Sequence, residues 1–182
     1  MTTRDSVSKV IKEYFQIILL FAVVFIVVYI FIGQLYEVTG DSMLPTLKNQ
    51  EQVIAEKISV NFTNLERGDI IIFKNPYEGN KLLIKRIIAL PGERFQIRDG
   101  DVYINGEILP EPYLEPDTRT YGQKILEQDF EYTVPLKSYV ALGDNRENST
   151  DSREWGYIKY ENIVGKTVLV YYPVKNIRLI EN

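Results

Sequence analysis

Residues 82–90 read LLIKRIIAL, an apolar run that two adjacent cations interrupt and a proline-glycine pair follows. A short run of branched apolar residues that ends at such a turn signal is typical of a buried β-strand. Successive side chains of a strand point to opposite faces, so Lys85 shares a face with Leu83 and Ile87. The run therefore predicts a strand that carries at least one cation into poorly hydrated surroundings.

The chain after residue 37 repeats this β texture. Short apolar runs at 70–73, 139–142 and 163–172 alternate with glycines and prolines. Residues 96–106 read QIRDGDVYING and predict a hairpin, because Asp-Gly and Asn-Gly pairs favour its tight turns. The sequence therefore predicts a mostly β fold, with one antiparallel β-sheet or barrel-like domain over residues 37–182.

One segment of this domain differs in composition from the rest. Residues 109–136 are polar and include four prolines. Prolines without a periodic apolar pattern are typical of loops. We therefore expect an excursion on the surface, to which the sequence assigns no role.

The N-terminal part of the chain has the features of a membrane anchor. Residues 15–36 carry no formal charge, and residues 17–32 are apolar without interruption. A helix of about 20 such residues spans a bilayer. Basic residues precede the run and acidic residues follow it directly, so the positive-inside rule puts residues 1–14 in the cytoplasm. We predict a single-pass transmembrane helix over 15–36 and an extracytoplasmic domain over 37–182.

The alternative interpretation of this run is a secretory signal that is removed. The apolar part of such a signal is about 7–15 residues long and ends at small residues. The run here is longer, and Gly33-Gln34-Leu35 makes a poor cleavage site. A retained anchor is therefore favoured.

Composition excludes several kinds of chemistry. The 182 residues contain neither cysteine nor histidine, and the net charge is −4. Without these residue types the chain has no disulfide, no thiolate zinc site and no serine–histidine pair. A negative net charge argues against broad electrostatic binding of nucleic acid. We expect no metal and no cofactor.

The candidate nucleophile is Ser42, in the stretch GDSMLPTL at residues 40–47. A glycine before the serine and a proline after it imply a tight turn, which can expose a hydroxyl and backbone N–H groups. Such N–H groups could form an oxyanion hole. The alternative is an ordinary turn where the chain leaves the membrane.

A serine nucleophile needs a base, and in the absence of histidine the candidate is Lys85. Burial disfavours a charged amine, whereas an arginine keeps its proton. Lowering a lysine pKa from about 10.4 towards 8 costs roughly 3 kcal/mol, which burial can supply. The alternative is an edge strand whose cations reach out to water.

A third block lies at residues 143–156 and reads GDNRENSTDSREWG. It follows an apolar strand and places four acids and two arginines in one loop. The functional interpretation is a rigid polar scaffold in which Asp–Arg pairs brace a site and a hydroxyl holds the lysine amine. The alternative is a solvated loop. The acid spacing does not fit a calcium loop.

Four motifs in this order resemble those of bacterial type I signal peptidase (leader peptidase), a single-anchor serine–lysine protease family. They are SMLPT at 42–46, RGD at 67–69, KR at 85–86 ahead of PG at 91–92, and the block GDNRENSTDSR at 143–153. The resemblance runs from the anchor nearly to the C-terminus. It implies a membrane-bound endopeptidase that cleaves signal peptides from exported preproteins after small residues at −1 and −3.

The resemblance also implies roles for individual residues. Ser42 would be the nucleophile, Lys85 the general base, and Ser149 the serine that hydrogen-bonds the lysine amine. A structural ion-pair network would comprise Asp144, Arg146, Asp151 and Arg153. The pockets for small substrate side chains would be lined by Val38, Met43, Leu47, Leu83 and Ile84.

The oxyanion hole departs from the pattern of some family members. Those members have a serine two residues before the nucleophile, where this chain has Gly40. Other single-anchor members also have glycine at that position. The resemblance therefore implies a hole made by the backbone of Ser42 and Gly40.

Two other functions are compatible with parts of the pattern. A self-cleaving repressor-type protease also uses serine and lysine on a related β fold, but the membrane run and the block at 143–153 argue against it. A membrane-tethered binding module could keep the fold without activity. Substituting Ser42→Ala would abolish cleavage and leave such a binding role intact.

Overall fold

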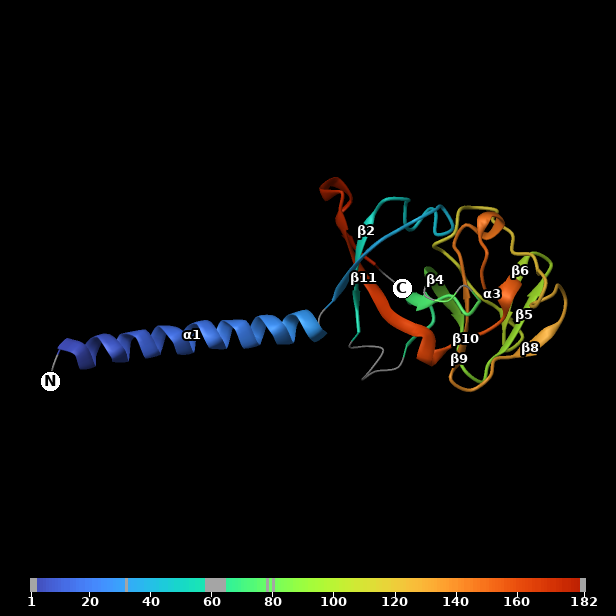
Figure 1. The fold of residues 1–182 in the computed structure, drawn as a ribbon. Helices are drawn as coiled ribbons and strands as arrows, with labels where there is room; N and C mark the ends of the chain where they lie inside the picture. The colour runs from blue at the N-terminus through green and yellow to red at the C-terminus, as the bar shows by residue number, and fades with distance from the viewer. Residues whose placement is uncertain (1–2, 32, 58–64, 78, 80, 181–182) are drawn as a thin grey trace.

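The computed structural model describes the chain except residues 1–2, 32, 58–64, 78, 80 and 181–182, and for residues 3–10 and 26–31 it describes the backbone alone. A long N-terminal helix, α1 (Thr3–Phe31), extends away from a β domain (Figure 1). Among the described residues, the other helical elements are one short α-helix and three 3-10 turns: η1 (Arg146–Asn148), α3 (Ser152–Trp155), η2 (Tyr160–Asn162) and η3 (Val174–Asn176).

The β domain contains two antiparallel sheets within the described residues. The larger sheet has the order β1-β2-β11-β3-β4-β9-β10, with β12 paired to β11. Its strands are β1 (Gln34–Glu37), β2 (Gln52–Glu56), β3 (Ile70–Lys74), β4 (Leu82–Ala89), β9 (Ser138–Leu142), β10 (Ile158–Lys159), β11 (Ile163–Tyr172) and β12 (Arg178–Leu179). The prediction of a mostly β, antiparallel fold is confirmed, and the larger sheet is open, with β1 and β10 at its two ends.

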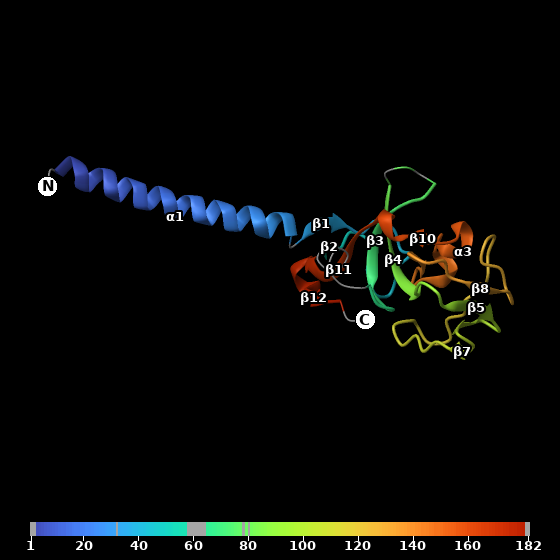
Figure 2. The ribbon, with the colours of Figure 1, turned by 90° about the horizontal axis from the view of Figure 1, so that it is seen from below.

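The smaller sheet lies on the side of the domain remote from α1, as Figure 1 and Figure 2 both show. Its order is β7-β6-β5-β8, from the strands β5 (Arg94–Arg98), β6 (Asp101–Ile104), β7 (Glu107–Ile108) and β8 (Glu131–Thr133). The predicted hairpin is confirmed. Asp99 and Gly100 join β5 to β6, and Asn105 and Gly106 join β6 to β7, each with positive φ as such turns require.

The N-terminal helix differs from its predicted bounds. It begins at Thr3 and ends at Phe31, whereas the sequence predicted residues 15–36. The end was wrong because the apolar residues that follow pair with another strand, Leu35 opposite Ile54. In the part of the chain that the structure describes, no helix combines the length and apolar character needed to cross a membrane. Residue 32 and the side chains of residues 26–31 belong to the predicted span but lie outside the part of the chain that the structure describes.

The prediction of a surface excursion over residues 109–136 is wrong at several positions. Thr120, Leu126 and Val134 are buried, and Leu126 packs in the core between the two sheets. Residues 131–133 form β8, which pairs with β5. Most other residues of the segment are exposed or half-buried, which accounts for its polar composition, and its buried positions depend on distant contacts that a local pattern does not record.

Candidate active site

The serine turn lies between β1 and β2, and the loop that follows β9 holds it. The backbone N–H of Asn145 donates to the Ser42 carbonyl oxygen at 3.0 Å, and its side-chain amide donates to the Asp41 carbonyl at 3.1 Å. Gly40 begins the turn with a φ of 92°, in the region that favours glycine. Ser42 is therefore fixed by residues about a hundred positions later in the chain.

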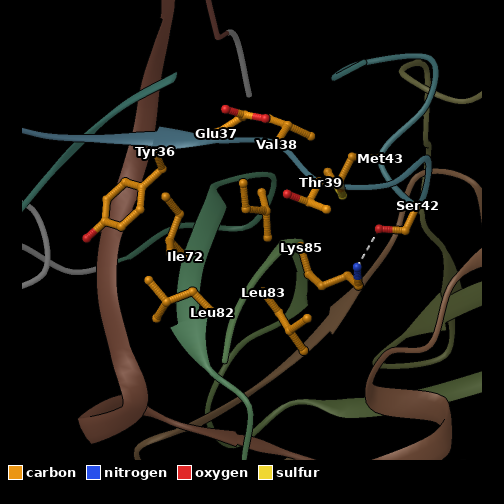
Figure 3. Close-up of a pocket in the computed structure, with 11 residues that line it drawn as sticks. Tyr36, Glu37, Val38, Thr39, Ser42, Met43, Ile72, Leu82, Leu83 and Lys85 are labelled. Atoms are coloured by element: carbon orange, nitrogen blue, oxygen red, sulfur yellow. Dashed lines mark hydrogen bonds between the residues drawn. The ribbon is translucent and has the colours of Figure 1, made fainter. Parts of the chain in front are cut away.

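Lys85 comes from β4, inside the larger sheet between β3 and β9. Its side chain is 3% exposed, and Nζ lies 2.6 Å from Ser42 Oγ, to which it donates a hydrogen bond (Figure 3). When the amine is neutral, the same contact can run in reverse, with the hydroxyl donating to Nζ. The structure thus brings together the two residues that the sequence singled out.

The surroundings of Lys85 favour its neutral form. Burial lowers the pKa of the amine from 10.5 to about 8, against the opposing charges of Asp151 and Asp144. Arg153 adds to the lowering. With a pKa near 8, about one amine in ten is neutral at pH 7 and most are neutral at pH 9. A general base in this range suits chemistry at moderately alkaline pH.

Gly143 allows the loop after β9 to approach the serine turn. A Cβ at this position would lie 2.5 Å from the Ser42 carbonyl oxygen and 2.3 Å from Ser149 Oγ. No real Cβ tolerates such distances, so only glycine fits here without movement of the backbone. The Gly143 N–H donates to Asp151 at 3.0 Å, which holds the strand end against the following loop.

The acids and arginines of this loop form buried ion pairs, but not all with one another. Asp151 pairs with Arg153 at 2.8 Å. Asp144 pairs instead with Arg86 of β4, also at 2.8 Å. Arg146 pairs with Glu111, from the segment that the sequence had placed on the surface.

Ser149 does not make the predicted hydrogen bond to the lysine amine. Its Oγ is buried and has no hydrogen-bond partner among the described residues. The hydroxyl packs against Gly143, and the Lys85 amine is directed at Ser42 instead. The predicted contact is therefore absent from this arrangement.

The two backbone groups predicted for the oxyanion hole differ in their hydrogen bonds. The Gly40 N–H donates to the Asn49 side chain at 2.9 Å and is occupied in this structure. The Ser42 N–H has no partner within the described residues and remains available. The Asn49 side chain captured the Gly40 donor, and nothing in the local sequence signals that contact.

A groove with a cavity volume of about 100 Å³ runs from the serine turn between β1 and β4 (Figure 3). Four of the five residues predicted for the substrate pockets line it: Val38, Met43, Leu83 and Ile84. Tyr36, Thr39, Ile72 and Leu82 line it as well. The fifth, Leu47, does not reach the groove. It is fully buried in the core beneath, beside Val53 and Ile70.

Sequence reasoning missed several polar residues that support the site. Thr46 donates to Asp144 at 2.5 Å, and the Arg86 guanidinium bonds the same carboxylate. Tyr113 stacks on Arg86 with 3.9 Å between the guanidinium carbon and the ring centroid. The sequence feature that could have indicated this contact is an aromatic residue, Tyr113, close to Glu111 in an otherwise polar segment. Within the described residues, no cluster of acidic side chains is placed to hold a metal ion.

Comparisons with known proteins place the chain in a class of hydrolases. The family model described as "Signal peptidase, peptidase S26" matches residues 11–172. The chain therefore belongs to this family, and it is an enzyme of the signal peptidase I type.

The relatives resemble the chain over most of their length. Signal peptidase I of Leptolyngbya laminosa is 40% identical over 157 residues, which cover 81% of this chain and 72% of that protein. Signal peptidase I of Bacillus caldolyticus is 39% identical over 155 residues, covering 80% and 83%. Signal peptidase IB of Staphylococcus aureus (strain Mu50) is 32% identical over 176 residues, covering 89% and 91%. A solved signal peptidase I of Enterococcus faecalis V583 is 34% identical, with 57% of this chain and 96% of that one covered and a TM-score of 0.46.

Proposed function

We propose that the protein is a membrane-anchored serine endopeptidase that removes signal peptides from exported preproteins, with Ser42 as nucleophile and Lys85 as general base. One observation carries this proposal: Lys85, a residue that is 3% exposed, places its amine 2.6 Å from the Ser42 hydroxyl on the turn that Gly40 begins. In a chain without histidine, this pair is a chemically competent way to activate a serine.

The reaction proceeds through an ester. Neutral Lys85 accepts the Ser42 proton as Oγ attacks the carbonyl carbon of the scissile bond, and the Ser42 N–H stabilises the oxyanion. The protonated amine then gives its proton to the leaving nitrogen, so that the C–N bond breaks and an acyl-enzyme remains. Lys85 next takes a proton from water as the water attacks the ester. It returns that proton to Ser42 Oγ as the C–O bond breaks, which releases the signal peptide and restores neutral Lys85 and free Ser42.

The groove supports selectivity for small side chains at −1 and −3. A substrate strand that enters beside Ser42 would lie along the apolar wall formed by Val38, Leu83 and Ile84. Side chains of an extended peptide that are two residues apart point to the same face, which fits recognition at −1 and −3. The limited volume of the groove, about 100 Å³, favours alanine-sized side chains.

The anchor would be the part of α1 that follows residue 14 and ends at Phe31. Its support lies in the sequence, where residues 17–32 are apolar without interruption. The described side chains between Ile11 and Phe25 are exposed, which suits contact with lipid. On this proposal, the N-terminus is cytoplasmic, the β domain is extracytoplasmic, and the serine works at the outer face of the cell membrane.

The experiment that tests the proposal incubates the full chain in detergent with a preprotein whose signal ends in alanine-x-alanine. Sequencing of the new N-terminus should locate cleavage directly after the second alanine. Ser42→Ala and Lys85→Ala should both abolish the product. Lys85→Arg keeps the charge but cannot supply a neutral base, so it should also be inactive. Strong cleavage by Lys85→Arg would show that the base lies elsewhere, and binding of the preprotein without any cleavage by the wild type would favour a binding module.

A further inference from the structure

The segment 109–136, which has no part in the reaction just described, packs against the back of the active site. We propose that Tyr113, held by Glu111, is a positioning residue for catalysis: its ring clamps the Arg86 guanidinium and so keeps Lys85 aligned with Ser42. This inference deepens the proposed function and rests on the proposed Ser42–Lys85 mechanism.

The ring completes a cage around a buried arginine. Arg86 is 1% exposed, and its guanidinium carbon lies 3.9 Å from the centroid of the Tyr113 ring. The edges of the guanidinium donate to Asp144 at 2.8 and 2.9 Å and to the Gly68 carbonyl at 2.9 Å. Acceptors thus fix the edges of the cation, and the ring covers its face. A desolvated cation held in this way gains more from an aromatic ring than an exposed one does.

Tyr113 is itself held in place by an ion pair. Its hydroxyl donates to Glu111 at 2.6 Å, and Glu111 accepts from Arg146 at 2.5 and 2.9 Å. Thr120 also accepts from Arg146, so two points of the segment, Glu111 and Thr120, reach the same guanidinium. Burial raises the pKa of Tyr113 above its ordinary value, which keeps the phenol a hydrogen-bond donor. The ring therefore has one orientation, set by residues outside the reaction.

Arg86 connects this clamp to both reacting residues. It follows Lys85 directly on β4, so movement of one changes the position of the other. Through Asp144 it also reaches Thr46, whose hydroxyl donates to that carboxylate at 2.5 Å and which lies in the turn that carries Ser42. One cation thus stabilises the strand of the base and the turn of the nucleophile.

Loss of the ring should raise the pKa of Lys85. The charged groups that act on its amine are Asp151, Asp144 and Arg153, and burial acts more strongly than any of them. A displaced Arg86 would compensate the charge of Asp144 less well, and it would let water reach the surroundings of the Lys85 amine. Both changes favour the protonated amine, so the enzyme would need a higher pH to reach the same activity.

The test compares three variants of the full chain in detergent, with kcat and KM for a signal-peptide substrate measured from pH 6 to pH 10. Tyr113→Met removes the ring and roughly keeps its volume, and Tyr113→Phe keeps the ring. Tyr121→Met is the control, because that tyrosine belongs to the same segment and is 58% exposed. We expect Tyr113→Met to lose about tenfold in kcat at pH 7 and to recover to within about threefold at pH 10, as a pKa rise of about one unit requires. KM should stay within about twofold, and Tyr113→Phe and the control should keep the wild-type midpoint.

The outcomes separate this inference from the mechanism on which it rests. A wild-type profile that does not rise through pH 8 refutes Lys85 as the base, and this inference falls with it. A wild-type rise combined with an equal loss for Tyr113→Met at every pH refutes the positioning role alone, as does a Tyr113→Phe midpoint that moves as far as that of Tyr113→Met. If circular dichroism shows that Tyr113→Met does not fold, Tyr113→Leu replaces it, because it also removes the ring and keeps an apolar side chain in the same site. Its midpoint should also move to higher pH, and an unchanged midpoint overturns the proposal.

Discussion

Replacing Lys85 by methionine should make the protein more stable at neutral pH while abolishing its activity. The amine has a pKa of about 8 in the folded chain against 10.5 when unperturbed, so folding disfavours its protonated form. Below pH 8 the full cost applies, and it disappears as the pH rises from 8 to 10.5, because the unfolded chain then loses the same proton. The difference between these pKa values corresponds to about 3 kcal/mol at pH 7, falling to about 1 kcal/mol at pH 10.

Urea unfolding of the full chain in one detergent, at pH 7 and at pH 10, measures this effect. Trp155 is the single tryptophan and packs in the core, so its fluorescence reports unfolding of the β domain. Lys85→Met should gain about 3 kcal/mol at pH 7 and clearly less at pH 10. The control Lys159→Met replaces an exposed lysine and should change stability by less than about 0.5 kcal/mol. A Lys85→Met variant that is no more stable than the wild type at pH 7, or whose gain is the same at both pH values, refutes a dry, pKa-lowered amine.

Three further predictions concern activity. In the wild type, kcat/KM should rise with pH through about 8 and level off above, since the base must be neutral; a flat profile from pH 6 to 9 contradicts this. Gly143→Ala places a Cβ 2.5 Å from the Ser42 carbonyl oxygen, so we expect a loss of about 1–3 kcal/mol in urea unfolding and about a hundredfold in kcat, and an unaffected rate would mean that the turn tolerates movement. Leu83→Phe narrows the groove and should raise KM about tenfold, whereas Leu47→Met, which alters a core residue outside it, should leave KM unchanged; equal effects would contradict the assigned groove.

The candidate nucleophile and base could be identified from the sequence because composition restricts the chemistry so severely. A chain without histidine has few bases for a serine, and strand periodicity placed Lys85 among apolar neighbours. The prediction of the hairpin at residues 96–106 used equally local information, since its two turns depend on two dipeptides. The hairpin was therefore predicted correctly, whereas the catalytic roles of Ser42 and Lys85 stay a prediction, which their 2.6 Å contact supports.

Contacts between distant segments were not predictable in the same way. Asn49 takes the Gly40 N–H, and Glu111 pairs with Arg146, but nothing near either partner signals the contact. The end of α1 was wrong for a related reason, because the apolar residues after Phe31 suit a helix or a strand, and pairing with β2 decides between them. Local patterns specify which elements form, and tertiary contacts specify where they end and which polar groups meet.

The buried ion pairs around the site are best understood through the amine that they surround. Asp144 and Asp151 hold the loop that pins the Ser42 turn, yet an unpaired carboxylate near Lys85 would favour its protonated form. Each of these acids has a buried arginine as its partner, Arg86 for the first and Arg153 for the second. A buried ion pair is weak evidence for stability, because desolvation offsets its Coulombic gain. Here the acids fix the backbone, and each of them raises the pKa of Lys85 less than burial lowers it, so the amine still loses its proton near pH 8.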